Sequence, residues 1–140
     1  VRSLRRYLLN GGFLMVDDFW GPYEWDNFHG QLKRVFPERN LVELTIDHEI
    51  FHCVYDLDEI PQIPSINYGR HGYSSEIRGA RPHYWALYDD NNRIMDMICH
   101  NTDLGDGWER EGENEYYFHE YSEKQAYPLG INIVVYALTH

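Results

Sequence analysis

Residues 4–18 read L-R-R-Y-L-L-N-G-G-F-L-M-V-D-D, and this stretch indicates an α/β protein. Leu4 and Leu8 are spaced as one apolar face of a helix, and two glycines follow them. Glycine supplies the left-handed residue that commonly ends a helix. The apolar run 13–16 then predicts a buried strand of a parallel sheet, with Asp17 and Asp18 at its carboxyl end.

The remaining elements follow from the same kinds of pattern. Asp89–Asn92 is turn chemistry that predicts an antiparallel hairpin, and Ser122 with Gln125 predicts a capping box. We expect the strand after Gly12 to be central and the hairpin strands to be peripheral. The result is a three-layer α/β domain, with helices over residues 2–10, 24–35 and 122–138 and strands over residues 13–17, 41–45, 83–88 and 93–99.

Size and charge limit the possible functions. The chain has 140 residues, enough for one domain over residues 1–140, and its formal net charge is −11. Such a charge disfavours nucleic acid and anionic membranes as partners. No apolar run approaches the roughly 20 residues that a membrane-spanning helix needs. Cys53 and Cys99 fit no metal-ligand spacing, so we interpret them as small buried hydrophobes, with a disulfide as the alternative.

The segment Cys99–Glu109, C-H-N-T-D-L-G-D-G-W-E, is the strongest candidate for chemistry. Open α/β sheets bind ligands at the carboxyl ends of their strands, where this segment and the Asp17–Asp18 pair both stand. Imidazole with carboxylates suits a divalent cation such as Zn, Mn or Fe, and a polyhydroxylated ligand is the other option. The alternative is a loop whose aspartates satisfy backbone N–H groups. The candidate catalytic residues are Asp17, Asp18, His100, Asp103 and Asp106, and all but Asp17 are candidate metal ligands.

Four further residues are candidates for binding a ligand. Trp20 and Trp108 stand in polar loops beside the expected site and could stack on sugar rings, which indicates a carbohydrate ligand. Glu109 belongs to the same loop, and His48 lies in a polar turn. For His48 the alternative is a turn histidine that hydrogen-bonds to backbone.

A long loop over residues 61–82 is rich in arginine and tyrosine, which resembles an interface composition. The alternative is an ordered surface loop whose arginines, Arg70, Arg78 and Arg81, pair with the excess acid of the chain.

Four motifs in this order resemble the DUF4159 family, a bacterial domain of unknown function that is often found in exported proteins. They are L-R-R-Y-L-L-N-G-G-F-L-M-V-D-D-F-W-G from Leu4, D-H-E-I-F-H from Asp47, H-N-T-D-L-G-D-G-W-E from His100 and L-G-I-N-I-V-V-Y-A-L-T-H from Leu129. The resemblance implies a periplasmic or extracellular location.

The chain is more distantly similar to the ThuA-like branch of the class I glutamine amidotransferase-like superfamily. Asp47–Ile50 stands in place of a His-Pro-Ile turn, Asp58–Ile60 in place of an Asp-Glu-x-Tyr segment, and Cys99–His100 in place of Gly-His. This similarity implies a flavodoxin-like fold, of which the chain is the C-terminal part, with the N-terminal βα units missing. Neither cysteine stands on a Gly-x-Cys-x-Gly elbow, so glutaminase chemistry is not implied.

Two functions compete. The first is a non-catalytic interaction or structural domain, a homo-oligomer or part of a larger exported assembly, that associates through an exposed sheet edge. The alternative is a metal-dependent or carbohydrate-related enzyme or binding domain that uses Asp18, His100, Asp103 and Asp106.

Overall fold

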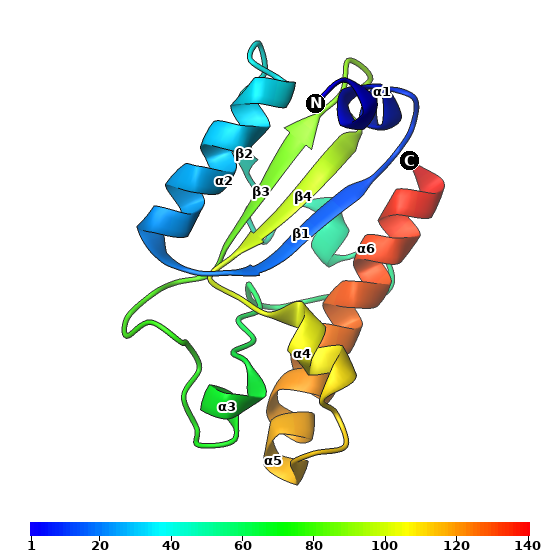
Figure 1. The fold of residues 1–140 in the computed structure, drawn as a ribbon. Coiled ribbons are helices and arrows are strands. Elements are labelled where there is room, and N and C mark those ends of the chain that lie inside the picture. The colour runs from blue at the N-terminus through cyan, green and yellow to red at the C-terminus, as the bar shows by residue number, and fades with distance from the viewer.

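A computed structural model describes residues 1–140 and contains a mixed, open, four-stranded sheet (Figure 1). The strands are β1 (Leu14–Phe19), β2 (Val42–Glu43), β3 (His83–Tyr88) and β4 (Ile94–His100), in the order β1-β4-β3-β2. β1 and β4 are parallel, whereas β3 is antiparallel to both of its neighbours. The predicted α/β class and the predicted hairpin are confirmed.

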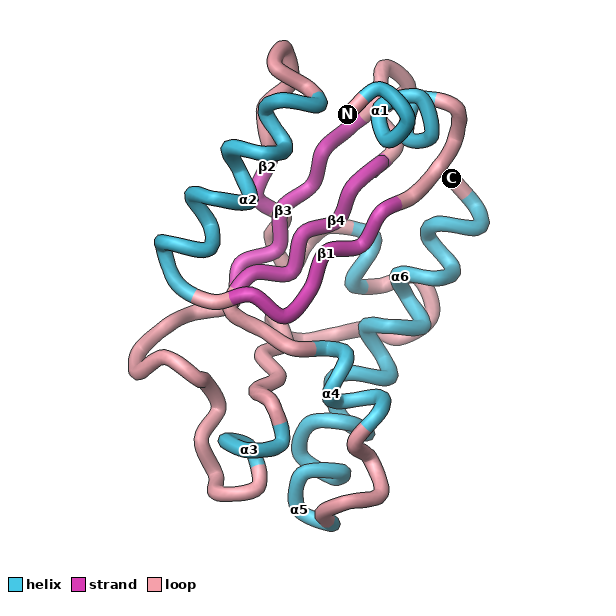
Figure 2. Tube along the Cα trace, viewed as in Figure 1, coloured by secondary structure: helices cyan, strands magenta, loops and turns pink.

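Helices cover both faces of this sheet (Figure 2). Helices α1 (Arg2–Leu9) and α2 (Gly21–Val35) pack on one face, and helix α6 (Tyr127–Thr139) packs on the other. The short elements are η1 (Glu49–Phe51), α3 (Ile66–Gly69), α4 (Leu104–Glu109), α5 (Glu115–Tyr117) and the π-helix η2 (Phe118–Ala126). In Figure 1, α3, α4 and α5 lie beyond the lower end of the sheet.

Local sequence signals explain how β1 is placed. Gly11 ends α1 with φ of +96°, and the Gly12 N–H returns to the carbonyl of Tyr7 at 2.9 Å. This left-handed turn feeds the chain directly into β1. After β1, the Glu24 carboxylate accepts the Trp20 N–H at 2.8 Å and so caps the start of α2.

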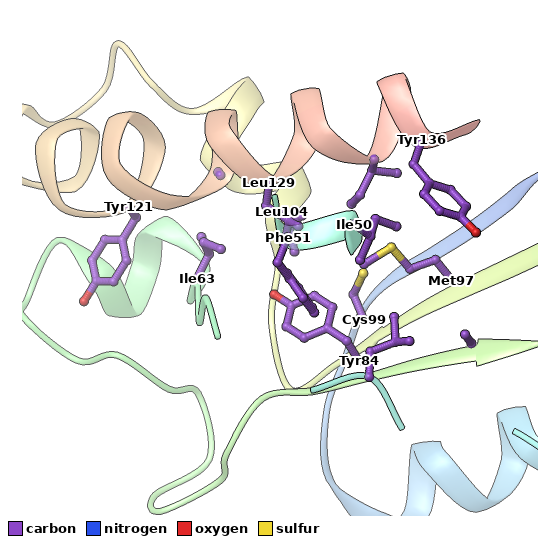
Figure 3. Packing of buried hydrophobic residues seen from close by; sticks show 14 of the residues in the cluster. Ile50, Phe51, Ile63, Tyr84, Met97, Cys99, Leu104, Tyr121, Leu129 and Tyr136 are labelled. Carbon is purple, nitrogen blue, oxygen red and sulfur yellow. The ribbon is translucent and has the colours of Figure 1, made fainter. Parts of the chain in front are cut away.

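Strand β4 joins two hydrophobic cores, because every one of its residues is buried. Met97 and Cys99 face α6 together with Tyr84, as Figure 3 shows, whereas Ile98 faces α1 and α2. Each large apolar side chain buried in this way stabilises the fold by roughly 1.5–3 kcal/mol. Both cysteines are free thiols, and of the two only Cys99 is fully buried as predicted, since Cys53 is half-buried.

The predicted strand order is wrong. β1 is an end strand, and the hairpin strands β3 and β4 occupy the centre of the sheet. The apolar residues on both faces of the strand after Gly12 indicate that it lies between two layers of helices, and both β1 and β4 do so. These residues do not indicate which strands pair with it. β3 becomes central because the short strand β2 pairs with its outer side.

The segment before α6 also differs from the prediction. Residues 104–121, for which the sequence predicts a polar loop and no helix, contain α4, α5 and the first part of η2. Ser122 caps nothing: it is fully buried inside η2, and its hydroxyl has no hydrogen-bond partner. The helical segment begins earlier, where the Asn114 side chain accepts the Tyr117 N–H at 2.9 Å. No helix of the chain combines the length and the apolar character that a membrane crossing requires.

Candidate functional site

The chain turns sharply at the carboxyl ends of the parallel strands β1 and β4. Asp18 and Asn101 both adopt left-handed backbone conformations, with φ of +57° and +60°. Aspartate and asparagine tolerate this region better than other non-glycine residues. The turns are tied together, because the Asn101 N–H donates to the Phe19 carbonyl at 3.0 Å and the Asp18 N–H to the Thr102 carbonyl at 3.2 Å.

Three aspartates at this edge are fixed by backbone N–H groups. Asp17 Oδ2 accepts the Gly105 N–H at 2.9 Å, and Asp103 Oδ1 accepts the Asp106 N–H at 2.8 Å as the N-cap of α4. Asp106 Oδ2 in turn accepts the Ile66 N–H at 2.8 Å. The alternative of aspartates that satisfy backbone groups is therefore confirmed, although each of these bonds uses only one carboxylate oxygen.

Three carboxylates converge beside these caps, and we call Asp18, Glu76 and Asp103 the acidic cluster. One oxygen from each residue lies within 4.8 Å of the other two. Asp103 is only 4% exposed, and its Oδ2 accepts no hydrogen bond. Glu76 comes from the loop before β3, where the Ser65 N–H donates to its Oε1 at 3.1 Å.

Burial makes negative charge unfavourable in this region. Loss of solvent raises the pKa of Asp103 to about 7, and the neighbouring carboxylates Asp18, Asp106 and Asp17 add to the effect. Burial likewise raises the pKa of Asp17 to about 6, and it also raises the pKa of Asp18. The acidic cluster therefore favours either a proton or a cation among its oxygens.

Little positive charge from the protein reaches the cluster. None of the three carboxylates forms an ion pair, and Arg110 pairs instead with the neighbouring Asp106, with Nε 3.7 Å from Oδ1. Neither His100 nor Arg78 forms a hydrogen bond or ion pair with any of these carboxylates.

The prediction that His100 joins Asp18, Asp103 and Asp106 is corrected by the structure. His100 lies on the α2 face, where its ring stacks 4.9 Å from Phe19 and 5.1 Å from Trp25, centroid to centroid. Its Nε2 donates to the Gly21 carbonyl at 3.0 Å. Successive strand residues point to opposite faces, so Cys99 faces α6 and His100 cannot.

The other candidate ligand-binding residues do not lie together at one site either. Trp20 is 9% exposed, and its buried indole N–H has no hydrogen-bond partner. Trp108 packs on α6 and donates its indole N–H to the Ala126 carbonyl at 2.8 Å. Glu109 acts only by charge, raising the pKa of Asp18. Trp108 also lines an apolar pocket of about 310 Å³ whose other lining residues belong to α6, and none of the three carboxylates lines this pocket.

His48 lies near the opposite end of the strands from the acidic cluster. Its Nδ1 accepts the Ile50 N–H at 3.1 Å and caps η1, and its Nε2 is 3.1 Å from the hydroxyl of Tyr88. Tyr88 pairs with Ile94 at the start of β4, far from the carboxyl ends. His48 is thus the turn histidine of the alternative interpretation.

Comparison with known proteins identifies the family of the chain. The family model described as "Domain of unknown function (DUF4159)" matches residues 1–138, so the chain belongs to this family. No curated protein matches the chain.

Proposed function

We propose that this member of the DUF4159 family binds a divalent cation through Asp18, Glu76 and Asp103. One observation carries the proposal: three carboxylate oxygens lie within 4.8 Å of one another, and the most buried of these residues, Asp103, has an oxygen with no hydrogen bond. A carboxylate held in place by a backbone N–H, with its second oxygen free, is prepared to coordinate a cation without reordering.

The all-oxygen donor set favours a hard cation, and we expect Ca²⁺ to bind more tightly than Mg²⁺ because Mg²⁺ gives up its water reluctantly. Two oxygens bound to one ion lie no further apart than twice the metal–oxygen distance. This maximum separation is about 4.2 Å for Mg²⁺ and about 4.6–5.2 Å for Ca²⁺. All three oxygens lie within 4.8 Å of one another, which is within the range for Ca²⁺ and leaves Mg²⁺ and Mn²⁺ as smaller alternatives. An all-oxygen donor set also replaces the zinc or iron that His100 suggested.

Such a cation keeps coordination positions for water or a ligand oxygen. The protein supplies three carboxylates here, whereas these cations take about 6–8 oxygen ligands. We therefore infer a metal-dependent function at the carboxyl ends of β1 and β4. The bound metal would either bind an oxygen-bearing ligand or catalyse a reaction of that ligand.

Calorimetric titration with CaCl₂, MgCl₂ and MnCl₂ tests this proposal. We expect binding by the wild type, with Ca²⁺ tighter than Mg²⁺, and loss of binding in Asp103→Asn. Asparagine keeps the acceptor oxygen that caps α4, so the variant retains the helix. Asp26→Asn, an exposed change on α2, is the matched control and should bind like the wild type. Equal affinity of Asp103→Asn and wild type, or no binding at all, would refute the proposal.

Protons should compete with the cation. Because the pKa of Asp103 is raised to about 7, the cation must displace a proton at lower pH. One such proton lowers the apparent affinity about tenfold between pH 8 and pH 6. An affinity that stays constant over this range would contradict a role for Asp103 as a ligand.

A second candidate function, association through the sheet edge, is supported by the end position of β1. The outer backbone groups of β1 have no strand partner, and such an edge can pair with another copy or with a different subunit of a larger exported assembly. The parallel β1–β4 pair with helices on both faces also supports a flavodoxin-like, class I glutamine amidotransferase-like architecture. Light scattering after gel filtration tests this candidate: a dimer that Leu14→Pro disperses would support it, and a monomer at all concentrations would refute it.

A further inference from the structure

A second concave site lies at the same carboxyl ends of β1 and β4, on the α2 face of the sheet. It has a volume of about 470 Å³ and is formed by Gly21 at the start of α2, by the loop before β3, and by the strand ends at His83 and His100. We call it the arginine pocket, because Arg78 and Arg81 form part of its wall. It is separate from the acidic cluster, to which none of its lining residues belongs.

The wall of the arginine pocket contains no carboxylate, although the chain has 23 acidic residues and a net charge of −11. Arg78 and Arg81 are exposed, and neither guanidinium forms an ion pair or a hydrogen bond with the protein. Other arginines of the chain do find acidic partners, namely Arg5, Arg39, Arg93 and Arg110. The alternative in which the loop arginines pair with excess acid is therefore not observed, since Arg70, Arg78 and Arg81 all lack an ion pair.

Two histidines in the wall also have free ring nitrogens. His100 is only 8% exposed. Its Nε2 donates to the Gly21 carbonyl, and its Nδ1 has no hydrogen-bond partner. His83 is held at Nδ1 by Glu43 Oε1 at 2.6 Å, which leaves its Nε2 without a hydrogen bond. The two rings stack with centroids 6.1 Å apart.

Asn101 holds the walls of the pocket in place. Its Oδ1 accepts the Gly21 N–H at 2.8 Å, and its Nδ2 donates to the Arg81 carbonyl at 2.8 Å. Gln62 adds a bond from Nε2 to the Ala80 carbonyl at 2.9 Å. The start of α2, the end of β4 and the loop before β3 are therefore fixed to one another, although the arginine side chains are free.

We propose that the arginine pocket binds a phosphate-type oxyanion, either free phosphate or the phosphoryl group of a small phosphomonoester. Paired guanidinium groups present fork-shaped donors that match the oxygens of phosphate. A volume of about 470 Å³ leaves room for the organic part of an ester beyond its phosphoryl group. This proposal does not depend on the cation, although Arg78 follows Glu76 by two residues and Gly21 follows Asp18 by three.

Phosphorus NMR titration of the intact chain with inorganic phosphate and with glycerol 3-phosphate, both in EDTA, tests the pocket alone. We expect saturable binding of both compounds, weakened about tenfold or more in the double variant Arg78→Gln/Arg81→Gln. Arg70→Gln, an exposed arginine of the same loop outside the pocket, should stay within about twofold of the wild type. Circular dichroism should show all variants folded, since the replaced side chains are exposed.

Two results would overturn the proposal: no saturable binding of phosphate by the wild type, or equal binding of phosphate by the double variant and the wild type. Because EDTA removes divalent cations, failure of the proposed cation site leaves this measurement unaffected. Failure of the arginine pocket would likewise leave the calorimetric test of Asp103 intact.

Discussion

The two sides of the carboxyl edge of the sheet differ in the sign of the charge that they present. On the α4 side, Asp18, Glu76 and Asp103 converge with little compensating positive charge. On the α2 side, Arg78 and Arg81 line a pocket without any carboxylate. Only two residues, Phe19 and Trp20, separate Asp18 from Gly21 along the β1–α2 connection.

This separation follows from strand geometry. Regular alternation places Cys99 and His100 on opposite faces. It would place Asp17 and Phe19 on the same face, but the strand is irregular between Val16 and Phe19, so that Asp17 points toward α4 and Phe19 toward α2. The left-handed turn at Asp18 then leads the chain across the edge. Neighbours in the sequence can therefore belong to sites of opposite chemistry.

The largest expected effect is loss of cation binding on one side without any change on the other. Asp18→Asn should lower Ca²⁺ affinity about 100-fold, because it removes a charged ligand. Its phosphate affinity in EDTA should equal that of the wild type. Calorimetry with Ca²⁺ and phosphorus NMR with phosphate measure the two sides separately, and parallel losses in both would show that they are one site.

A second prediction compares Asp103 with Asp96, a buried aspartate on β4. Asp96 is fully buried, neither of its oxygens has a hydrogen-bond partner, and burial alone raises its pKa to about 7. The folded protein keeps this proton up to about pH 7, whereas the unfolded chain releases it near the ordinary value of 3.8. Stability should therefore fall as pH rises between these values, by up to about 4 kcal/mol from this group.

Asp96→Asn should remove that loss. We expect it to raise the free energy of unfolding by up to about 4 kcal/mol at pH 8 and to change it little at pH 4. Urea denaturation at the two pH values measures the difference. Addition of Ca²⁺ at pH 8 should stabilise this variant as much as the wild type, because Asp96 is not a ligand. A variant that is less stable than the wild type at pH 8 would show that the Asp96 charge is compensated.

The sequence predicted much of the scaffold because its main elements carry strong periodicity. The strand over residues 83–88 is observed with the predicted ends, α1 ends one residue earlier than predicted, and β4 is shifted by one residue at both ends. The segment over residues 104–121 was not predicted as helical, since its apolar residues are interrupted by glycines and acids. Strand order depends on pairing between distant segments, which periodicity does not record.

The site was predictable only where it directly follows strands. Asp18 and Asp103 were found in this way. Glu76 stands in a long loop without periodicity, and no local signal connects it with the strand ends. His100 also ends a strand, but Met97 and Cys99, which alternate with it, are apolar and face α6. Strand alternation therefore places His100 on the other face.

A third prediction concerns His100 itself. His100→Ala should cost about 2–3 kcal/mol of stability, because it removes a buried ring that stacks on Phe19 and Trp25 and a hydrogen bond to Gly21. Ca²⁺ affinity should not change. Thermal unfolding and calorimetry on the same sample test both statements, and a loss of Ca²⁺ binding in a folded variant would return His100 to the cation site.

The smallest expected effect is at Gly21, which has φ of +78°. Gly21→Ala should cost about 1–2 kcal/mol, because an L side chain is strained in this conformation, and its Cβ would lie 2.9 Å from Ile77 Cδ1. Phosphate affinity should fall while Ca²⁺ affinity is retained. Equal losses of both affinities would indicate that the strain spreads across the edge.

Anomalous diffraction at the manganese edge, from crystals of the chain soaked in MnCl₂, tests the cation site most directly. We predict one strong peak within coordination distance of Asp18, Glu76 and Asp103, and no peak at His83 or His100. A manganese peak on the histidines, or a vacant acidic cluster in crystals grown above pH 7.5, where about three quarters or more of Asp103 is ionised, would contradict it.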